Sequence, residues 1–428
     1  MLTRRALLTA AGAAAGATAT AATLAACDPS PPPSTAAGGG APFDPNSWSS
    51  VRAQFALTEG VANFVTFYLA SHAATVRAAI ERHRTGLDAD AHGYLLANEE
   101  TLDRTVRTEA AAYLRTQPGR IALTDSTTMG LGLLYSGLRL RAGDEVLTTE
   151  HDFYATHESL RLRTVRDGVT VRRVRLFDDP ARADVGDIVR RLRAAVTART
   201  RVVAITWVHS STGVKLPIRA IADALAEVNR GRADDQRALL CVDGVHGFGV
   251  EDATPDALGC DFLVSGCHKW LFGPRGTGLI WGSEAGWRRF TPIIPTFGAP
   301  DTPGSLATPG GFHSFEHRWA LAEAFALHRA VGATRVAERT RALASALKDG
   351  LVALPKVRLH TPRTPDLSAG LVCCEVDGYD AGEAVLALSR AKVLASATPY
   401  SPSYLRFGPS ILTSESDVES ALRAVRSL

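Results

Sequence analysis

The chain has 428 residues, of which 46% are hydrophobic and 21% are charged, and this balance excludes a disordered, collagen-like or multi-spanning membrane protein. Lys and Arg number 47 against 44 Asp and Glu, so the formal net charge of +3 gives no sign of a nucleic-acid-binding surface. A chain of this length is expected to form one large domain and a smaller one, or two of similar size.

Residues 1–27 have the features of an export signal: paired arginines at positions 4 and 5, an Ala/Thr/Gly-rich stretch and no acidic residue. The Arg-Arg-Ala-Leu-Leu segment resembles a twin-arginine signal, which exports folded proteins, and Leu-Ala-Ala-Cys27 resembles a lipobox. The alternative, a plain Ala-rich helix or membrane anchor, is disfavoured as a span by the many Thr and Gly residues. With a Pro/Gly/Ser linker at 28–46, we expect an exported protein in the periplasm or on the outer face of the cytoplasmic membrane, tethered through lipidated Cys27.

From about residue 47 the chain alternates helical patterns with short apolar runs, which is typical of an α/β protein with a parallel sheet. Seven strands are predicted, at 121–124, 145–148, 171–174, 202–205, 239–242, 262–264 and 278–281. Apolar residues three and four apart predict helices between them, at 101–114, 129–138, 188–195 and 218–228.

The end of the chain predicts a second, smaller domain. A long helical stretch at 316–348 leads to an apolar strand pattern at 369–376 and a closing helix at 415–425. We therefore assign residues 47–315 to an N-terminal segment with a large α/β domain, and residues 316–428 to a small α+β domain.

Polar side chains follow two of the predicted strands, and in open α/β sheets ligands bind beyond the carboxyl ends of the strands. Asp243 ends one strand, and Lys269 comes shortly after the next one in the chain. An acid and a lysine in these places fit pyridoxal phosphate, because the carboxylate keeps the pyridine nitrogen protonated and the amine bonds the aldehyde. The sequence thus predicts pyridoxal 5'-phosphate as cofactor, with Lys269 as the Schiff-base lysine that later moves a proton.

The phosphate of this cofactor is predicted to sit at the start of a helix. Thr127 and Thr128 lie between a strand and the helix that follows it, where helix N-terminal amides and hydroxyls bind phosphate well. Ser265 and His268, close to the lysine, are expected to add further donors.

An aromatic ring after the strand at 145–148 is expected to stack on the pyridine face. His151 is the first choice, with Phe153 or Tyr154 as the alternatives. No metal site is expected, because the six cysteines show no Cys/His ligand spacing, and His313 and His317 lack a third ligand.

Three motifs together resemble the class V aminotransferase-like family of fold-type I pyridoxal-phosphate enzymes. They are Asp243-Gly-Val-His246, Ser265-Gly-Cys-His-Lys-Trp-Leu-Phe-Gly-Pro-Arg-Gly-Thr-Gly278 and Ser126-Thr-Thr-Met-Gly130. The likeness spans most of residues 50–428, and through His-Lys-Trp, Asp-Gly-x-His and Val208-His-Ser-Ser-Thr-Gly-Val-Lys-Leu-Pro217 the chain resembles the isopenicillin-N-epimerase-like members. It implies a mostly parallel central sheet flanked by helices, a smaller C-terminal domain and a homodimer with shared active sites.

The resemblance also implies roles for single residues. Lys269 matches the Schiff-base lysine and Asp243 the pyridinium partner, while His246 and Ser210 match neighbours of the cofactor O3′. Arg406, in Tyr-Leu-Arg-Phe-Gly-Pro-Ser, resembles the arginine that clamps the substrate α-carboxylate, a task that suits a bidentate guanidinium.

Two further points follow from the resemblance. Thr308 is placed in the loop that reaches the phosphate in the partner subunit, although Gly-Gly-Phe-His around it departs from the usual form. The family's cysteine desulfurases need a nucleophilic Cys shortly before the clamping Arg, and residues 390–406 contain none, so sulfur transfer by that route is disfavoured.

The sequence as a whole predicts an exported enzyme that uses pyridoxal phosphate to act on an amino acid or small amino compound. We expect Cα deprotonation through Lys269 and an epimerase or lyase type of reaction. A class V aminotransferase is one alternative, and a pyridoxal-phosphate-binding sensor or scavenger without turnover is another.

Overall fold

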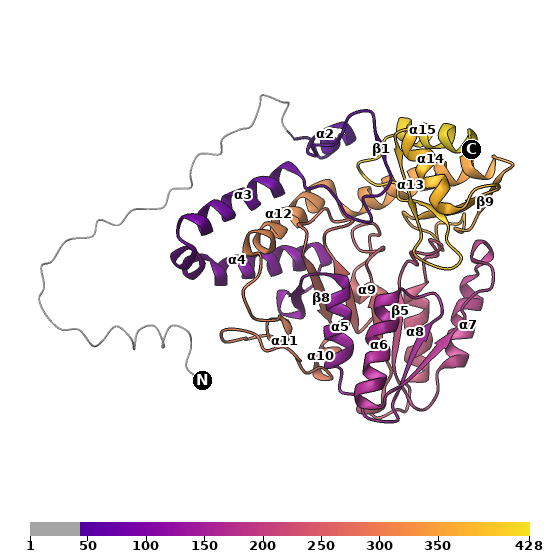
Figure 1. The fold of residues 1–428 in the computed structure, drawn as a ribbon. Helices are drawn as coiled ribbons and strands as arrows, with labels where there is room; N and C mark the ends of the chain where they lie inside the picture. The colour runs from indigo at the N-terminus through magenta and orange to yellow at the C-terminus, as the bar shows by residue number, and fades with distance from the viewer. Residues whose placement is uncertain (1–42) are drawn as a thin grey trace, which may run out of the picture.

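A computed structural model describes residues 43–428, so the export signal and the linker up to residue 42 lie outside the described residues. The described chain forms a large α/β domain and a smaller C-terminal domain, which is packed against one end of it (Figure 1). No helix in residues 43–428 has the length and apolar character needed to span a membrane.

A seven-stranded sheet forms the centre of the large domain and confirms all seven predicted strands. In spatial order the strands are β2 (Ile121–Thr124), β8 (Gly278–Gly282), β7 (Phe262–Gly266), β6 (Leu239–Asp243), β5 (Thr200–Thr206), β3 (Glu145–Thr149) and β4 (Thr170–Val174). Only β8 runs antiparallel to its neighbours. The strands are near-continuous apolar runs because helices cover both faces of the sheet. The fold is therefore the mostly parallel α/β architecture that the sequence predicts.

Helices cover the two faces of this sheet as separate sets. On one face lie α5 (Thr127–Gly137) and α6 (Tyr154–Asp167). On the other lie α4 (Ala91–Leu114), α7 (Val185–Ala195), α8 (Ile218–Val228) and α12 (Phe315–Val331). The helix α3 (Ala74–Ala89) packs on α12, and the short helices of this part are α2 (Trp48–Ala53), α9 (Pro255–Leu258), α10 (Glu284–Arg288) and α11 (Pro303–Ala307).

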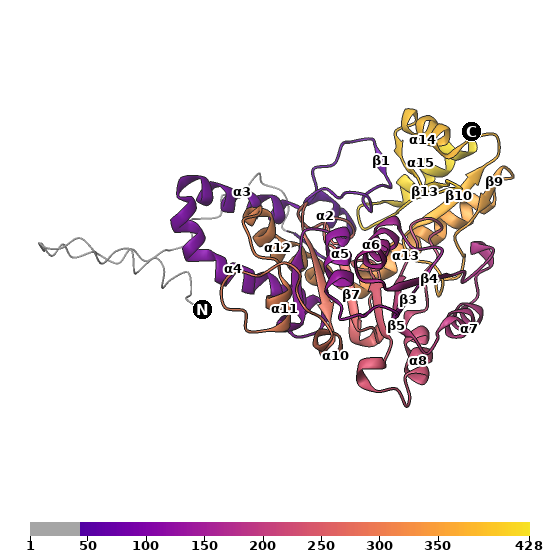
Figure 2. The same cartoon turned by 60° about the horizontal axis from the view of Figure 1, so that its bottom comes forward.

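The small domain has its own sheet and core. Its antiparallel strands are β12 (Ser396–Ala397), β13 (Leu405–Phe407), β10 (Val372–Val376) and β9 (Val357–Leu359), in that spatial order. Its helices are α13 (Ala333–Val352), α14 (Ala381–Arg390) and α15 (Glu415–Arg426). The N-terminal segment also reaches this domain, because β1 (Ala62–Asn63) pairs in parallel with β11 (Val393–Leu394) (Figure 2).

The chain passes from the core of the large domain to that of the small one at Gly332, within the helical stretch predicted at 316–348. The predicted helix at 316–348 is broken at Gly332, whose φ of 92° is a conformation that favours glycine. Before the break, α12 packs on α3 and α4 and buries Phe325 in the large core. After it, Leu343 and Leu347 of α13 join the core of the small domain. Apolar periodicity continues through the glycine, so it does not reveal which core each half enters.

Candidate active site

Lys269 and Asp243 lie at the carboxyl edge of the central sheet, where β6 and β7 end. Lys269 is half-buried, three residues beyond the end of β7. Burial is the main cause that lowers the pKa of its amine, to about 8 in all; the Asp243 carboxylate opposes this shift and the Arg406 guanidinium adds to it. The structure thus brings together the lysine, the acid and the arginine that the sequence singled out.

Asp243 has a free hydrogen-bonding position that matches a cofactor nitrogen. Its carboxylate is 1% exposed, and one oxygen accepts a hydrogen bond from the Val245 amide at 3.1 Å. The other oxygen is buried and has no hydrogen-bond partner among residues 43–428. Burial raises the pKa of this carboxyl to about 6. Because buried polar atoms are normally paired, this oxygen fits the protonated ring nitrogen of pyridoxal phosphate.

The phosphate end of the site is the start of α5. Ser126 caps this helix, with its hydroxyl accepting from the Met129 amide at 3.1 Å. The Thr127 hydroxyl accepts from the Gly266 amide at 2.7 Å, and Thr128 is exposed in the same first turn. The first amides of a helix have no partner within it and bind phosphate well. Thr127 and Thr128 therefore lie in the first turn of a helix, and their binding of phosphate stays a prediction.

Two further phosphate donors were predicted, Ser265 and His268. The structure places His268 near the Thr127 hydroxyl at the start of α5. A Cβ atom on Gly266 would lie 3.0 Å from the His268 ring and 3.1 Å from the Thr127 hydroxyl, so glycine lets the two side chains approach each other. His268 is half-buried, with Nδ1 3.2 Å from the Thr277 carbonyl. Ser265 is fully buried in β7 and donates to the Gly266 carbonyl at 3.0 Å, so its contact with phosphate stays a prediction.

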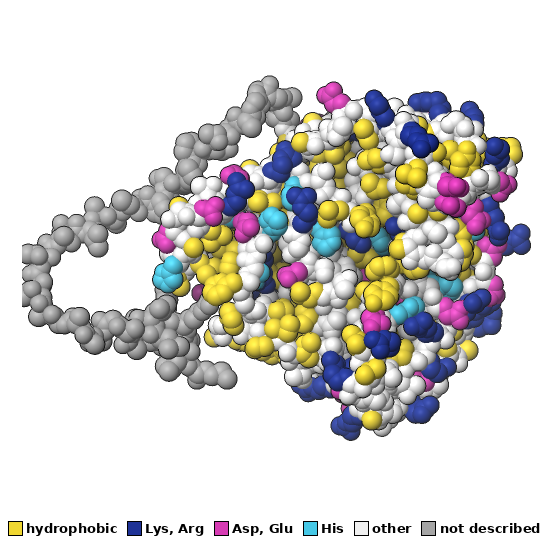
Figure 3. Space-filling model, in the orientation of Figure 1, with side chains coloured by type: hydrophobic (Ala, Val, Ile, Leu, Met, Phe, Trp, Pro, Cys, Tyr) yellow, Lys and Arg dark blue, Asp and Glu magenta, His cyan; other side chains and the backbone are white. Residues whose placement is uncertain are grey.

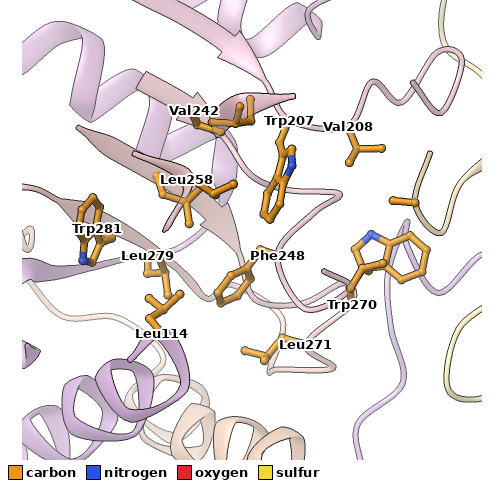
Figure 4. Close-up of a cluster of buried hydrophobic side chains, with 14 of the residues drawn as sticks. Leu114, Trp207, Val208, Val242, Phe248, Leu258, Trp270, Leu271, Leu279 and Trp281 are labelled. Carbon is orange, nitrogen blue, oxygen red and sulfur yellow. The ribbon is translucent and has the colours of Figure 1, made fainter. Parts of the chain in front are cut away.

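His246 is held beside the lysine as an uncharged ring. Its Nδ1 accepts a hydrogen bond from the Trp270 indole at 3.2 Å. Burial, together with the charges of Lys269 and Arg406, holds the pKa of His246 well below its usual value. Trp270 belongs to the buried cluster under the site, where it lies near Trp207 and Leu271 (Figure 4). The packed indole fixes the orientation of His246.

The ring that covers the cofactor face is better assigned to Phe153 than to His151. His151 already stacks on Phe177, with centroids 3.9 Å apart, and its Nε2 accepts a hydrogen bond from the Leu176 amide. Tyr154 is 68% exposed and points to solvent. Phe153 is half-buried at the start of α6, with its ring 6.2 Å from that of Tyr400. Because Phe177 occupies one face of the His151 ring, we favour Phe153, and the choice among the three rings stays a prediction.

Arg406 is a buried guanidinium without a carboxylate partner among the described residues. It is 4% exposed, lies 4.6 Å over the Phe67 ring and has no ion pair with any described residue. It donates to the Ser210 carbonyl at 2.8 Å and to the Ser396 hydroxyl at 3.1 Å, which fixes its position. The Ser210 hydroxyl is 2.6 Å from that of Tyr400. A buried unpaired cation held by neutral groups is suited to a carboxylate ligand.

Within its own chain, Thr308 forms a hydrogen bond with neither Lys269 nor the start of α5. It is 5% exposed, and its hydroxyl donates to the Gly304 carbonyl at 2.9 Å and accepts from the Leu123 amide at 3.1 Å. These bonds tie the end of α11 to β2. Within its own chain Thr308 thus has a structural role, and its contact with the phosphate in the partner subunit stays a prediction.

Neither a reactive cysteine nor a metal centre is present in the part of the chain that the structure describes. Its five cysteines are buried and form no disulfide, and burial raises the pKa of the Cys267 and Cys373 thiols. No three His, Cys, Asp or Glu side chains gather there as metal ligands.

Sequence reasoning missed Tyr400, Phe67 and Ser396. Tyr400 stands in a Pro-Tyr-Ser-Pro-Ser-Tyr loop just before Arg406, which is a signal that could have been read. Phe67 and Ser396 carry no such signal. Phe67 reaches the guanidinium from the N-terminal segment, and Ser396 lies opposite Arg406 because β12 pairs with β13.

An α/β sheet with a lysine, a buried acid and a phosphate-binding helix start at its carboxyl edge defines a pyridoxal 5'-phosphate enzyme of fold type I. The chain belongs to the aminotransferase class-V family, whose model matches residues 93–401. The cofactor is accordingly pyridoxal 5'-phosphate.

Curated relatives with two different activities match the chain. It is 27% identical to an isopenicillin N epimerase from Streptomyces clavuligerus, over 89% of this chain and 98% of that protein. It is also 29% identical to a cysteine desulfurase from Enterobacter sp. (strain 638), over 55% of this chain and 57% of that protein.

Solved structures share the fold. A C-DES mutant with glycine covalently linked to the cofactor superimposes with a TM-score of 0.80 and 21% identity, over 88% of this chain and 99% of that one. The cystine C-S lyase C-DES in complex with cysteine persulfide gives 0.79 and 22%, over 86% and 98%. At these identities the likeness supports the fold alone.

Proposed function

We propose that this protein is a pyridoxal-phosphate-dependent epimerase that removes and returns the Cα proton of an amino acid. The observation that carries the proposal is Lys269, an amine with lowered pKa that lies beside both a buried unpaired carboxylate oxygen and a buried unpaired arginine. The nearly full-length similarity to an isopenicillin N epimerase supports this reaction type over a transaminase.

The residues that would hold the cofactor are those of the carboxyl edge. Thr127, Thr128 and His268 bind the phosphate, Phe153 covers the ring, and Asp243 accepts from the ring nitrogen. When bound, pyridoxal phosphate supplies an electron-withdrawing ring that stabilises negative charge at Cα.

Arg406 and Lys269 divide the work on the substrate. Arg406 binds the α-carboxylate, and because Ser210 and Ser396 fix its guanidinium, it orients the Cα–H bond. With a pKa near 8, Lys269 has a sizeable neutral fraction at neutral pH and takes the proton from Cα. Asp243 counters the positive charge of the ring nitrogen throughout.

Tyr400 is our candidate for returning a proton on the second face. Its hydroxyl is held by Ser210, and burial raises its pKa to about 12, so it remains protonated at neutral pH. Tyr400 is also close enough to Arg406 and Asp243 to interact electrostatically with both. A protonated group near a bound carboxylate is what inversion at Cα requires in addition to Lys269.

Tyr400→Phe should separate inversion from proton exchange. We expect the rate of inversion to fall about 100-fold, in the range for loss of one acid–base group, while deuterium uptake at Cα continues with retained configuration. Chiral chromatography and mass spectrometry in D₂O follow the two. Tyr404→Phe, in the same loop but with its ring stacked on His360, serves as the control. An equal fall of both rates, or no change in either, contradicts this role.

The reaction type is tested by incubating the full-length holoenzyme with L- and D-amino acids in D₂O. We expect the amino acids that shift the visible absorption band of the cofactor to take up deuterium at Cα and to yield both enantiomers. Release of a β-substituent would identify a lyase, and an oxo acid with an aminated cofactor would identify an aminotransferase. If no amino acid changes the spectrum, the protein is a binding protein without turnover.

Export and assembly complete the proposal. We place the enzyme outside the cytoplasm, tethered through Cys27, because a twin-arginine signal would export it with its cofactor already bound.

We also propose a homodimer, since the segment from α10 to α12 exposes several large apolar side chains. Its exposed side chains are Ile293, Ile294, Phe297, Leu306 and Phe312. Membrane fractionation of Cys27→Ser and size-exclusion chromatography with light scattering test the two statements.

A further inference from the structure

A second cavity, of about 620 Å³, lies at the opposite edge of the central sheet. Its lining includes Asp144 just before β3, Leu239 at the start of β6 and Asp261 just before β7. The candidate active site lies at the other ends of these strands, so a five-residue strand, about 15 Å, separates the two. The volume is within the range of small-molecule sites, about 300–1,000 Å³.

The lining of this cavity is rich in arginine. Six arginines and four aspartates contribute to it, which leaves a net charge of +2 when all are ionised. The arginines are Arg139, Arg141, Arg201, Arg237, Arg288 and Arg289. Figure 3 shows Lys and Arg side chains along the lower edge of the molecule, where Figure 1 places the lower ends of α5, α6 and α10.

Carboxylates neutralise these arginines only in part, and one of the pairs joins Arg288 to Glu284 at 2.7 Å. Asp144 forms an ion pair with Arg201 at 3.3 Å and accepts from the Arg141 amide at 2.8 Å. The Asp261 carboxylate accepts hydrogen bonds from the Leu240 amide at 2.9 Å and the Ser283 hydroxyl at 3.1 Å. Burial raises the pKa of Asp261. The remaining two, at positions 234 and 235, are exposed.

Several arginine side chains here have no carboxylate partner. Those of Arg141 and Arg237 make no hydrogen bond or ion pair with any described residue. Arg289 donates only to the Arg237 carbonyl, and Arg139 only to the Thr291 hydroxyl and the Phe290 carbonyl. Burial and the charge of Arg201 lower the pKa of Arg289. Arginines that outnumber the nearby carboxylates leave a local positive field that a bound anion relieves.

We propose that this arginine cavity binds a small polyanion through a diphosphate group, as in inorganic pyrophosphate or a nucleoside diphosphate. Planar guanidinium groups pair with phosphate oxygens in bidentate fashion, and several of them together match a group with more than one negative charge. Because the cavity lies away from the carboxyl edge, the site does not depend on the proposed reaction.

The test uses titration calorimetry of the full-length holoenzyme with sodium pyrophosphate at constant ionic strength. The bound cofactor keeps its own phosphate position filled. We expect saturable binding of one pyrophosphate per chain. The double variant Arg141→Gln/Arg237→Gln removes two exposed, unpaired side chains and should weaken binding roughly tenfold or more, since charge-assisted hydrogen bonds to phosphate are lost. Amino-acid turnover should not change.

The matched control is Arg390→Gln/Arg426→Gln, which removes two exposed arginines without ion pairs from the small domain. This variant should bind pyrophosphate as the parent does. Equal weakening in both double variants would mean unspecific attraction and would overturn the proposal. Absence of saturable binding, tighter binding of citrate than of pyrophosphate, or competition between pyrophosphate and the cofactor would each overturn it as well.

Discussion

Replacing Lys269 with alanine is expected to abolish the visible absorption band of lysine-bound pyridoxal phosphate. The rate of Cα deuterium exchange should fall about 1,000-fold or more, because general acid–base catalysis alone contributes about 10²–10⁴-fold and the covalent attachment is lost too. The fold should persist, since Lys269 is half-buried and its removal relieves a desolvated amine. Absorption spectroscopy, exchange kinetics and circular dichroism measure the three effects.

Lys348 offers a demanding control for this prediction. Burial lowers its pKa to about 8 as well, but its amine donates to the carbonyls of Pro362 and Arg363 and to the Ser368 hydroxyl. Lys348→Ala should therefore reduce thermal stability and leave the absorption band in place. A band that survives in Lys269→Ala, or disappears in Lys348→Ala at full folding, would refute the assignment of the cofactor-binding lysine.

Asp243→Asn should change stability and activity in opposite directions. In the cofactor-free protein, burial raises the pKa of Asp243 from its ordinary value of 3.8 to about 6, so folding favours the protonated acid. The resulting stabilisation is complete below the unfolded pKa and is lost as the pH rises through about 6. At pH 8 the variant should gain about 3 kcal/mol in free energy of unfolding, since one pKa unit corresponds to ~1.4 kcal/mol.

The same substitution should lower turnover of the holoenzyme about 10²–10³-fold, because an amide carries no charge to stabilise the protonated ring nitrogen. Urea denaturation of the cofactor-free protein at pH 4 and pH 8, together with holoenzyme kinetics, checks both effects. Asp261→Asn is the control, because Asp261 also has a raised pKa but lies at the opposite edge of the sheet. A stability gain that is the same at both pH values, or unchanged turnover, would contradict the role of Asp243.

Local sequence patterns are enough to locate the central sheet and the polar residues that end its strands. Strands buried on both faces are continuous apolar runs, and their ends are marked by short polar motifs, so local patterns sufficed to locate all seven. For the same reason Asp243, Lys269 and the Thr127-Thr128 pair were predictable. Each acts where its own strand or helix ends, so its position follows from sequence neighbours.

Contacts between side chains of distant elements depend on tertiary packing and could not be predicted from local sequence. Whether His151 or Phe153 faces the cofactor depends on Phe177, which takes the His151 ring from a neighbouring segment. Tyr400 joins the site through a hydroxyl contact with Ser210, 190 positions earlier in the chain. The domain boundary at Gly332 and the arginine cavity likewise depend on how distant segments pack. Such contacts are set by shape and burial between elements, which local propensity does not encode.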